Sequence, residues 1–168
     1  MKKCILIVED DPAISRLIES NLLVAGYEPV CAMDGKQALD AISSHHFDLA
    51  LCDIMLPELD GFELLPYMQE RNIPVIYVSA KADVQSRVQG LRLGAEDYLV
   101  KPFDILELLV RMEKVLTREK LLRQVWGDEY IGETRTVDVH VAALRKKLGL
   151  TEQLATVFKL GYRLEVEA

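Results

Sequence analysis

Short apolar runs alternate with helical patterns along roughly the first two thirds of the chain. Five of these runs have the length and the branched or aromatic side chains of buried strands: "CILIV", "YEPVC", "DLALC", "PVIYV" and "DYLV". The stretches between them carry apolar residues at helical spacing, starting at Pro12, at about 35–44, 60–71 and 83–93, and from 104 onward. Strands that alternate with helices predict parallel βαβ units, and therefore an α/β domain with a doubly wound sheet of five parallel strands.

Two prolines and a glycine refine the expected helices. Pro12 occupies a favoured first-turn position, and Gly26 is a typical helix terminator. Pro66 falls inside the third expected helix, so that helix should be kinked there, or its assignment is wrong. The apolar face of the first helix is predicted to consist of Ile14, Leu17, Ile18 and Leu22.

The last third of the chain has a different pattern. The stretch "TREKLLRQVWG" predicts a helix that ends at Gly127, and "TRTVDVHVAALRKKLG" predicts a second helix over residues 134–148. The stretch "ATVFKLGYRLEVE" predicts a β-hairpin that turns near residues 159–161. The fifth helix of the first part could run unbroken into the first of these helices, because its apolar positions keep to one side.

Charge separates the same two parts. Of the total net charge of −7, residues 1–116 carry −8 and residues 117–168 carry +1, from 9 Lys and Arg against 8 Asp and Glu. Non-specific affinity for nucleic acid comes from cations that displace counterions, so the first part is a poor candidate for such binding. No apolar run is long enough for a signal peptide or a membrane span, and the 3 cysteines show no metal-binding spacing. We expect a cytoplasmic protein with no membrane partner.

Polar residues follow four of the expected strands, at the point where each strand ends. Glu9, Asp10 and Asp11 follow the first strand and Asp53 follows the third. The fourth strand ends at Ser79 and the fifth is followed by Lys101. Ligands of an open parallel sheet bind outside the carboxyl ends of its strands, so these side chains should meet in one pocket.

These residue types suit phosphoryl chemistry on a carboxylate. Converging carboxylates favour a hard divalent cation such as Mg²⁺, which takes oxygen ligands. A carboxylate beside such a metal can accept a phosphoryl group, and Lys101 and the Ser79 hydroxyl could bind the incoming phosphoryl oxygens. Each residue alone is explained more simply as a turn, a helix cap or a surface side chain. Four such features at successive strand ends are much less easily explained in that way.

The stretches "ILIVEDD", "DLALCDIMLPELDGFELL", "PVIYVSAKAD" and "GAEDYLVKPF" resemble the receiver domain of two-component response regulators, over residues 3 to about 118. The resemblance implies a flavodoxin-like (βα)5 fold, with Asp53 as the residue phosphorylated by a sensor histidine kinase. It implies that Glu9 and Asp10 form an acidic pocket, and that Asp10, Asp53 and the Met55 carbonyl bind Mg²⁺ or Mn²⁺. It also implies that Lys101 precedes a proline whose peptide bond is often cis.

The resemblance further implies a switch and a dimer surface. Ser79 would move toward the phosphoryl group, and Tyr98 would swing into the space it leaves, repacking the surface of the fourth helix, fifth strand and fifth helix. Charges of both signs on that surface resemble the pairs of symmetric dimers in the OmpR/PhoB subfamily: Arg87 with Glu107, Asp97 with Arg111, and Glu96 with Arg118. The alternative is a solvated charged face, in which each pair contributes little.

Residues from about 116 to 166 resemble the back end of the OmpR/PhoB winged-helix effector domain, with the helix at 134–148 as recognition helix and the hairpin as wing. The front of that domain, a small sheet and a helix, has no counterpart here, so the fragment should be truncated. The expected DNA contacts are Arg135, Thr136, His140 and Arg145. Ala142 and Ala143 stand where arginines are common, and Phe158 and Lys159 replace the usual Arg-Gly of the wing, which weakens the expectation of DNA binding.

We therefore expect a receiver domain over 1–118 and a truncated winged-helix region over 117–168, acting in phosphorylation-controlled transcription regulation through promoter DNA. The rival hypothesis is a natural or engineered deletion form that is phosphorylated and dimerises but does not bind DNA. An enzyme is not expected. A phosphatase of the haloacid-dehalogenase type would need a second Asp two residues after Asp53, where Met55 stands.

Overall fold

The computed structural model describes residues 2–126, 141–142, 145–146, 154–157 and 161–164, with side chains described up to residue 117 and at 141–142 and 145–146. The chain divides into two compact units, Met1–Met112 and Glu113–Ala168. The first unit holds the sheet that the apolar runs predict.

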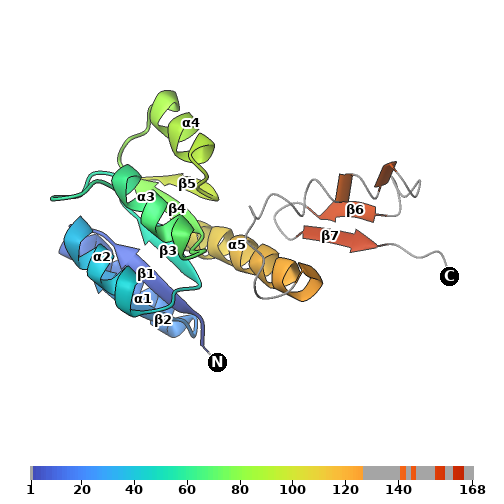
Figure 1. Ribbon diagram of the computed structural model, residues 1–168, viewed down its shortest axis with the longest axis horizontal. Helices are drawn as coiled ribbons and strands as arrows, with labels where there is room; N and C mark the ends of the chain where they lie inside the picture. The colour runs from blue at the N-terminus through green and yellow to red at the C-terminus, as the bar shows by residue number, and fades with distance from the viewer. Residues whose placement is uncertain (1, 127–140, 143–144, 147–153, 158–160, 165–168) are drawn as a thin grey trace. The chain divides into compact units, whose positions relative to one another are not determined.

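The sheet of the first unit has five parallel strands in the order β2-β1-β3-β4-β5 (Figure 1). The strands are β1 (Cys4–Val8), β2 (Glu28–Ala32), β3 (Leu49–Cys52), β4 (Val75–Ser79) and β5 (Asp97–Val100). Strands β1, β3 and β4 are almost wholly buried, as their unbroken apolar runs predict. The order and direction confirm the flavodoxin-like α/β fold, and they bring the ends of β1, β3, β4 and β5 to one edge.

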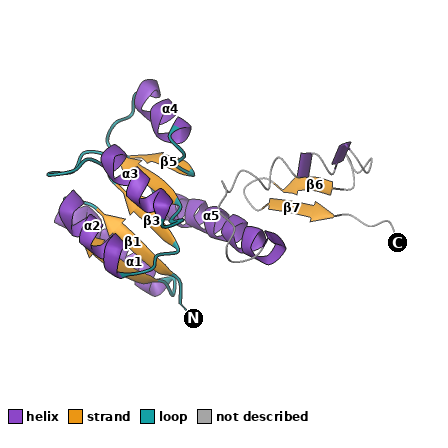
Figure 2. Cartoon of the chain, in the orientation of Figure 1, coloured by secondary structure: helices purple, strands orange, loops and turns teal. Residues whose placement is uncertain are grey.

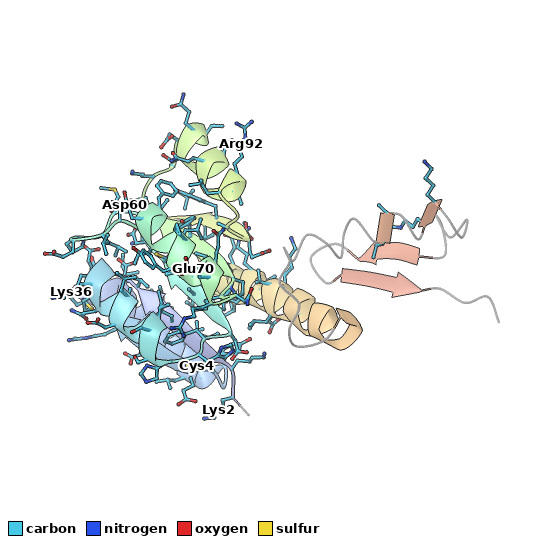
Figure 3. All side chains as sticks on the ribbon, viewed as in Figure 1. Lys2, Cys4, Lys36, Asp60, Glu70 and Arg92 are labelled. Atoms are coloured by element: carbon cyan, nitrogen blue, oxygen red, sulfur yellow. The ribbon has the colours of Figure 1, made fainter. Side chains whose placement is uncertain are left out.

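Helices connect the successive strands of the sheet (Figure 2), and an aspartate caps the N-terminus of each of the first four. They are α1 (Pro12–Val24), α2 (Gly35–Ser44), α3 (Gly61–Glu70), α4 (Val84–Arg92) and α5 (Ile105–Trp126). The caps of the first four are Asp11, Asp34, Asp60 and Asp83, each of which accepts a hydrogen bond from a backbone N–H of the first turn. Asp60, which Figure 3 labels, also forms a reciprocal capping box with Glu63 at the start of α3.

The buried stripe of α1 differs from the predicted one at one position. Ile18 and Leu22 are buried as expected and Ile14 is partly buried, but Leu17 is 50% exposed. Ser15 is buried in its place. Ser15, Ile18 and Leu22 follow each other at spacings of three and four, so they form one narrow stripe, and Leu17 lies about 100° away from Ile18 around the helix. The prediction that Leu17 faces the core was wrong.

Pro66 does not end α3. Its missing N–H removes the donor that would bond to the Phe62 carbonyl, yet the helix continues to Glu70. Leu64, Leu65 and Met68 are buried on either side of the proline. The helix assignment is therefore confirmed, because tertiary packing of the buried face compensates for the lost hydrogen bond.

Helix α5 is one continuous element of 22 residues, which joins the last receiver helix to the segment "TREKLLRQVW". The hairpin is also present: β6 (Leu154–Val157) pairs antiparallel with β7 (Gly161–Leu164), and Val157 lies opposite Gly161. The expected helix at 134–148 lies mostly outside the described residues, and residues 141, 142, 145 and 146 have helical backbone. Among the described residues, no helix is long and apolar enough to cross a membrane.

Candidate functional site

Three carboxylates meet where β1 and β3 end. Val8 is paired with Cys52 across the two strands, and the Asp53 backbone N–H donates to the Val8 carbonyl at 2.9 Å, so the residues that follow the strands lie side by side. Carboxylate oxygens of Glu9, Asp10 and Asp53 lie within 4.8 Å of one another. Glu9 is 2% and Asp53 5% exposed, whereas Asp10 faces solvent. Such a set of hard oxygen donors, open on one side, fits a divalent cation such as Mg²⁺.

Lys101 supplies the only cation that contacts this cluster among the described residues. Its Nζ lies 2.5 Å from Asp53 Oδ2 and 2.6 Å from Glu9 Oε2. The backbone N–H of Lys101 donates to the Ser79 carbonyl at 2.9 Å, and the peptide bond to Pro102 is cis. Lys101 thus connects the ends of β1, β3 and β5, as expected from the sequence.

The surroundings raise the pKa of Lys101 and the pKa of Glu9, the two groups that face each other in this contact. Burial lowers the pKa of Lys101, but hydrogen bonds and charge from Asp53 and Glu9 outweigh that effect, so its pKa is raised. Burial raises the pKa of Glu9, and the nearby Lys101 offsets this effect only in part. One ammonium therefore does not fully compensate two buried carboxylates, and a further cation would be favourable at this edge.

The segment after Asp53 holds its carboxylate and main chain in place. The Met55 backbone N–H donates to Asp53 Oδ1 at 3.0 Å, and the Cys52 thiol donates to the Asp53 carbonyl at 3.1 Å. A Cβ on Gly61 would lie 2.3 Å from the same carbonyl oxygen, so only glycine fits there. The Met55 side chain is exposed, and the metal-binding role of its carbonyl stays a prediction.

Ser79 is fully buried at the end of β4. Its Oγ has no hydrogen-bond partner in the described part of the chain. Buried hydroxyl groups are nearly always paired, so a further hydrogen-bond acceptor beside Ser79 Oγ would be favourable. This position agrees with the expectation that Ser79 binds an incoming oxygen atom.

Tyr98 lies with its ring packed inward and is 7% exposed. Its hydroxyl donates to the Lys81 carbonyl at 2.8 Å, in the segment between β4 and α4. Its ring centroid is 6.0 Å from that of Tyr77 on β4. Tyr98, the aromatic switch predicted from the sequence, therefore contacts the strand that ends at Ser79 and the loop that follows this strand.

The charged side chains expected to pair between subunits are partly paired within one chain. Arg111 Nη1 lies 2.7 Å from Asp97 Oδ2, and Arg111 Nη2 lies 2.5 Å from Glu107 Oε1. Arg87 is exposed and Glu96 is partly buried, whereas the Arg118 side chain lies outside the described residues. Pairing across a dimer stays a prediction. It would have to share or replace the contacts that Arg111 makes within its own chain.

The predicted DNA contacts are largely beyond the described residues. Arg135, Thr136 and His140 lie outside them. Arg145 has helical backbone and is partly buried. Two residues that the strand-end pattern did not single out also belong to the site: Gly61, which packs on the Asp53 carbonyl, and Tyr77, whose hydroxyl donates to the Gly61 carbonyl at 2.9 Å. A glycine after Asp60 was visible in the sequence, but nothing indicated what it packs against.

Two family models match the chain. The model of the response regulator receiver domain matches residues 5–113, and the model of the C-terminal region of transcriptional regulatory proteins matches residues 98–164. The receiver domain of a sensor histidine kinase from Pseudomonas aeruginosa, solved with a magnesium ion coordinated in its active-site cleft, superposes with a TM-score of 0.64 at 32% identity. The superposition spans 70% of this chain and 99% of the Pseudomonas receiver domain.

Full-length relatives extend the similarity to both parts. A probable transcriptional regulatory protein of Picosynechococcus is 32% identical over 232 positions, which span 96% of this chain and 92% of the relative. The response regulator ArlR of Staphylococcus aureus is 32% identical over 213 positions, which span 94% of this chain and 97% of ArlR. The alignment with the first relative has 232 positions, and this chain, 96% of whose 168 residues are aligned, fills about 161 of them. About 71 positions of the alignment therefore have no residue in this chain.

We expect Lys101→Met to lower the free energy of unfolding by about 3 kcal/mol in metal-free buffer, because it leaves two buried carboxylates without their cation. Millimolar Mg²⁺ should restore more stability to this variant than it adds to the wild type, since the metal replaces the missing charge. Urea unfolding followed by circular dichroism, with EDTA or with Mg²⁺, measures both effects. The exposed Lys36 (Figure 3) provides the control substitution Lys36→Met. Equal losses in the two variants would show that the contact contributes no net stability.

Proposed function

The chain belongs to the response regulators that carry a receiver domain and a transcriptional regulatory C-terminal region, and we propose that phosphorylation of Asp53 controls its activity. The observation that carries this proposal is the buried Asp53 carboxylate held between Lys101 Nζ, at 2.5 Å, and the carboxylates of Glu9 and Asp10. The unpaired Ser79 hydroxyl supports it, because phosphorylation supplies the acceptor oxygens that this group lacks.

The acceptor reaction follows from these positions. A carboxylate oxygen of Asp53 attacks phosphorus, the new O–P bond forms, and the bond to the donor breaks with its electron pair leaving on the donor. With a sensor histidine kinase as donor, that pair returns to a histidine ring nitrogen. Lys101 stays beside the transferred group and neutralises part of its charge. We place this reaction in the cytoplasm.

Mg²⁺ is the cofactor that this carboxylate set would bind, with Mn²⁺ as an alternative of similar coordination. Glu9, Asp10 and Asp53 supply its oxygen donors, and the Met55 carbonyl is proposed as a further ligand. When bound, the metal neutralises charge that develops on the phosphoryl oxygens. The magnesium ion coordinated in the Pseudomonas receiver domain supports this assignment.

We assign the switch to Ser79 and Tyr98, with a homodimer as its output. Ser79 donates to a phosphoryl oxygen, and Tyr98 responds because its hydroxyl is anchored on the loop that follows β4. The dimer surface comprises α4, β5 and α5, with Arg87, Glu96, Asp97, Glu107, Arg111 and Arg118 as its charged residues. The exposed Val84 and Val88 lie on α4 of the same surface and would add apolar contact area.

For the C-terminal region we propose regulation of promoter DNA, with Arg135, Thr136, His140 and Arg145 as contacts. The rival is a deletion form whose receiver is phosphorylated and dimerises without DNA binding. The positions of the relatives that have no residue here favour this rival, since an effector domain without its front would leave apolar helix faces uncovered. In both cases we propose a chain that is not an enzyme, and a phosphatase of the haloacid-dehalogenase type is disfavoured because Met55 stands where that type needs a second aspartate.

Acetyl phosphate with Mg²⁺ should phosphorylate the wild type, whereas Asp53→Asn should stay unmodified because the amide is a poor nucleophile. Intact-mass spectrometry after a fixed incubation measures the product. Asp40→Asn, an exposed position on α2, is the matched control and should react as the wild type does. If Asp53→Asn is labelled as fully as the wild type, the acceptor lies elsewhere and the proposed function is wrong.

Phosphorylation should convert the chain from monomer to dimer, and Arg87→Glu should weaken that dimer by placing like charges at its interface. Sedimentation velocity with and without acetyl phosphate measures the change. Arg16→Glu, an exposed arginine on α1, makes the same charge reversal away from the surface and should leave dimerisation intact. A dimer that tolerates Arg87→Glu as well as Arg16→Glu would exclude this surface.

The DNA hypothesis predicts binding of duplex DNA that weakens steeply with salt, because cationic side chains release counterions from the phosphates. Fluorescence anisotropy of a randomised duplex pool with the phosphorylated chain measures it. Arg135→Ala should reduce the affinity and lower the salt slope by about one if Arg135 binds a phosphate. Absence of binding even at low salt would favour the deletion form.

A further inference from the structure

Among the side chains that the structure describes, Tyr77 is the largest of those that are fully buried, and it stands in the middle of the apolar strand β4. Its hydroxyl donates to the Gly61 carbonyl at 2.9 Å, across sixteen residues of sequence. A valine, leucine or isoleucine would fill the strand position without a polar atom. A buried tyrosine instead brings a hydroxyl that must be paired, so the position is defined by its hydrogen bond as well as by its volume.

Gly61, which accepts this hydrogen bond, lies directly against Asp53, the proposed site of phosphorylation. The Gly61 N–H donates to the Ile54 carbonyl at 3.0 Å, and a Cβ on Gly61 would meet the Asp53 carbonyl at 2.3 Å. Gly61 therefore has no room to move toward Asp53, and its own carbonyl is held from the other side by Tyr77. Both ends of the segment from Asp53 to Gly61 are therefore held in place. Asp53 directly follows β3, and Gly61 accepts the hydrogen bond from Tyr77.

The ring of Tyr77 contacts the switch side of the domain. Its centroid is 6.0 Å from that of Tyr98 and 5.4 Å from that of Phe62, against which it packs edge to face. A Cβ on Gly90 in α4 would lie 3.0 Å from the Tyr77 ring and 3.3 Å from the Tyr98 ring. One side chain thus contacts α3, α4 and the aromatic switch.

The loop after β4 completes this arrangement. Lys81 accepts the Tyr98 hydroxyl with its backbone carbonyl, and its Nζ lies 5.9 Å from the centroid of the Phe62 ring. Phe62 is the residue after Gly61, so the loop touches the start of α3 as well as Tyr98. A movement of Tyr98 or of this loop changes the space beside the Tyr77 ring. Tyr77 is in turn hydrogen-bonded to Gly61, at the end of the segment that starts at Asp53.

We propose that Tyr77 is a positioning residue that couples the acceptor segment, residues 53–61, to Tyr98 and α4. It acts through the hydroxyl bond to Gly61 on one side and through ring contacts on the other. This inference rests on the proposed phosphorylation of Asp53 and adds a route between that site and the dimer surface. The simpler alternative is that Tyr77 only fills the core, in which case its hydroxyl contributes to stability and to nothing else.

The variant Tyr77→Phe keeps the ring and removes the hydroxyl. We expect its limiting rate of phosphorylation by acetyl phosphate, at saturating Mg²⁺, to fall by roughly two- to tenfold, the factor that corresponds to one net hydrogen bond. The acetyl phosphate concentration at half the limiting rate should stay unchanged, because Tyr77 does not touch the donor. Tyr67→Phe, which removes an exposed hydroxyl from α3, is the control and should react at the wild-type rate.

Amide NMR spectra of the full chain test the coupling itself. On addition of beryllofluoride and Mg²⁺, resonances of α4 should move less in Tyr77→Phe than in the wild type, and they should move fully in Tyr67→Phe. A lower melting temperature with an unchanged limiting rate and unchanged α4 shifts would overturn the inference and leave Tyr77 as a core residue.

Two outcomes need separate measurements. If Tyr77→Phe does not fold, the ring resonances of Tyr77 in the wild type decide the matter: they should shift on addition of beryllofluoride, and unmoved resonances overturn the coupling. If the wild type is not phosphorylated at all, the proposed function fails. In that case the effect of Tyr77→Phe on the Gly90 and Tyr98 amides of the unmodified chain, compared with that of Tyr67→Phe, still decides whether the two sides are connected.

Discussion

The contact of Lys101 with Glu9 and Asp53 is the interaction on which the site depends. Two carboxylates with almost no exposure stand at the ends of neighbouring strands, and removing such charges from water costs several kcal/mol each. One ammonium at 2.5–2.6 Å from both offsets part of that cost. The remaining negative charge, with Asp10 beside it, keeps the edge suited to a divalent cation. The arrangement that stabilises this site is therefore also the one that suits the proposed phosphorylation of Asp53.

The strand ends could be predicted from the sequence because a parallel sheet leaves little choice. Each strand of a βαβ unit ends at the same edge, so Glu9, Asp53, Ser79 and Lys101 converge whatever the details of the helices. Asp11 shows the limit of that argument. It follows the same strand as Glu9, yet its carboxylate accepts from two backbone N–H groups of α1 and takes no part in the carboxylate cluster. Sequence position alone does not distinguish a cap from a ligand.

Contacts between distant segments were the part that the sequence could not specify. Leu17 belongs to an apolar pattern, but a small rotation of α1 selects Ser15 for the core instead. The charges of Arg111 and Asp97 suggest a pair, but the pattern cannot say whether the pair forms within a chain or between two chains. Tyr77 was hidden in an apolar run because its hydrogen-bond partner, Gly61, is defined only by the folded loop after β3. In each case the missing information is a distance between elements.

The continuity of α5 follows from local chemistry. Its sequence from Ile105 to Trp126 contains no glycine or proline and is rich in Leu, Glu, Lys, Arg and Met, which are strong helix formers. This stretch holds no local stop signal, which agrees with a helix that runs through all of it. This chain lacks about 71 of the positions aligned with a full-length relative. The last helix of the receiver therefore continues directly into the C-terminal region as far as Trp126. Over Ile105–Trp126, the part of this connection that the structure describes, the backbone is helical throughout, so no flexible linker separates Met112 from Trp126.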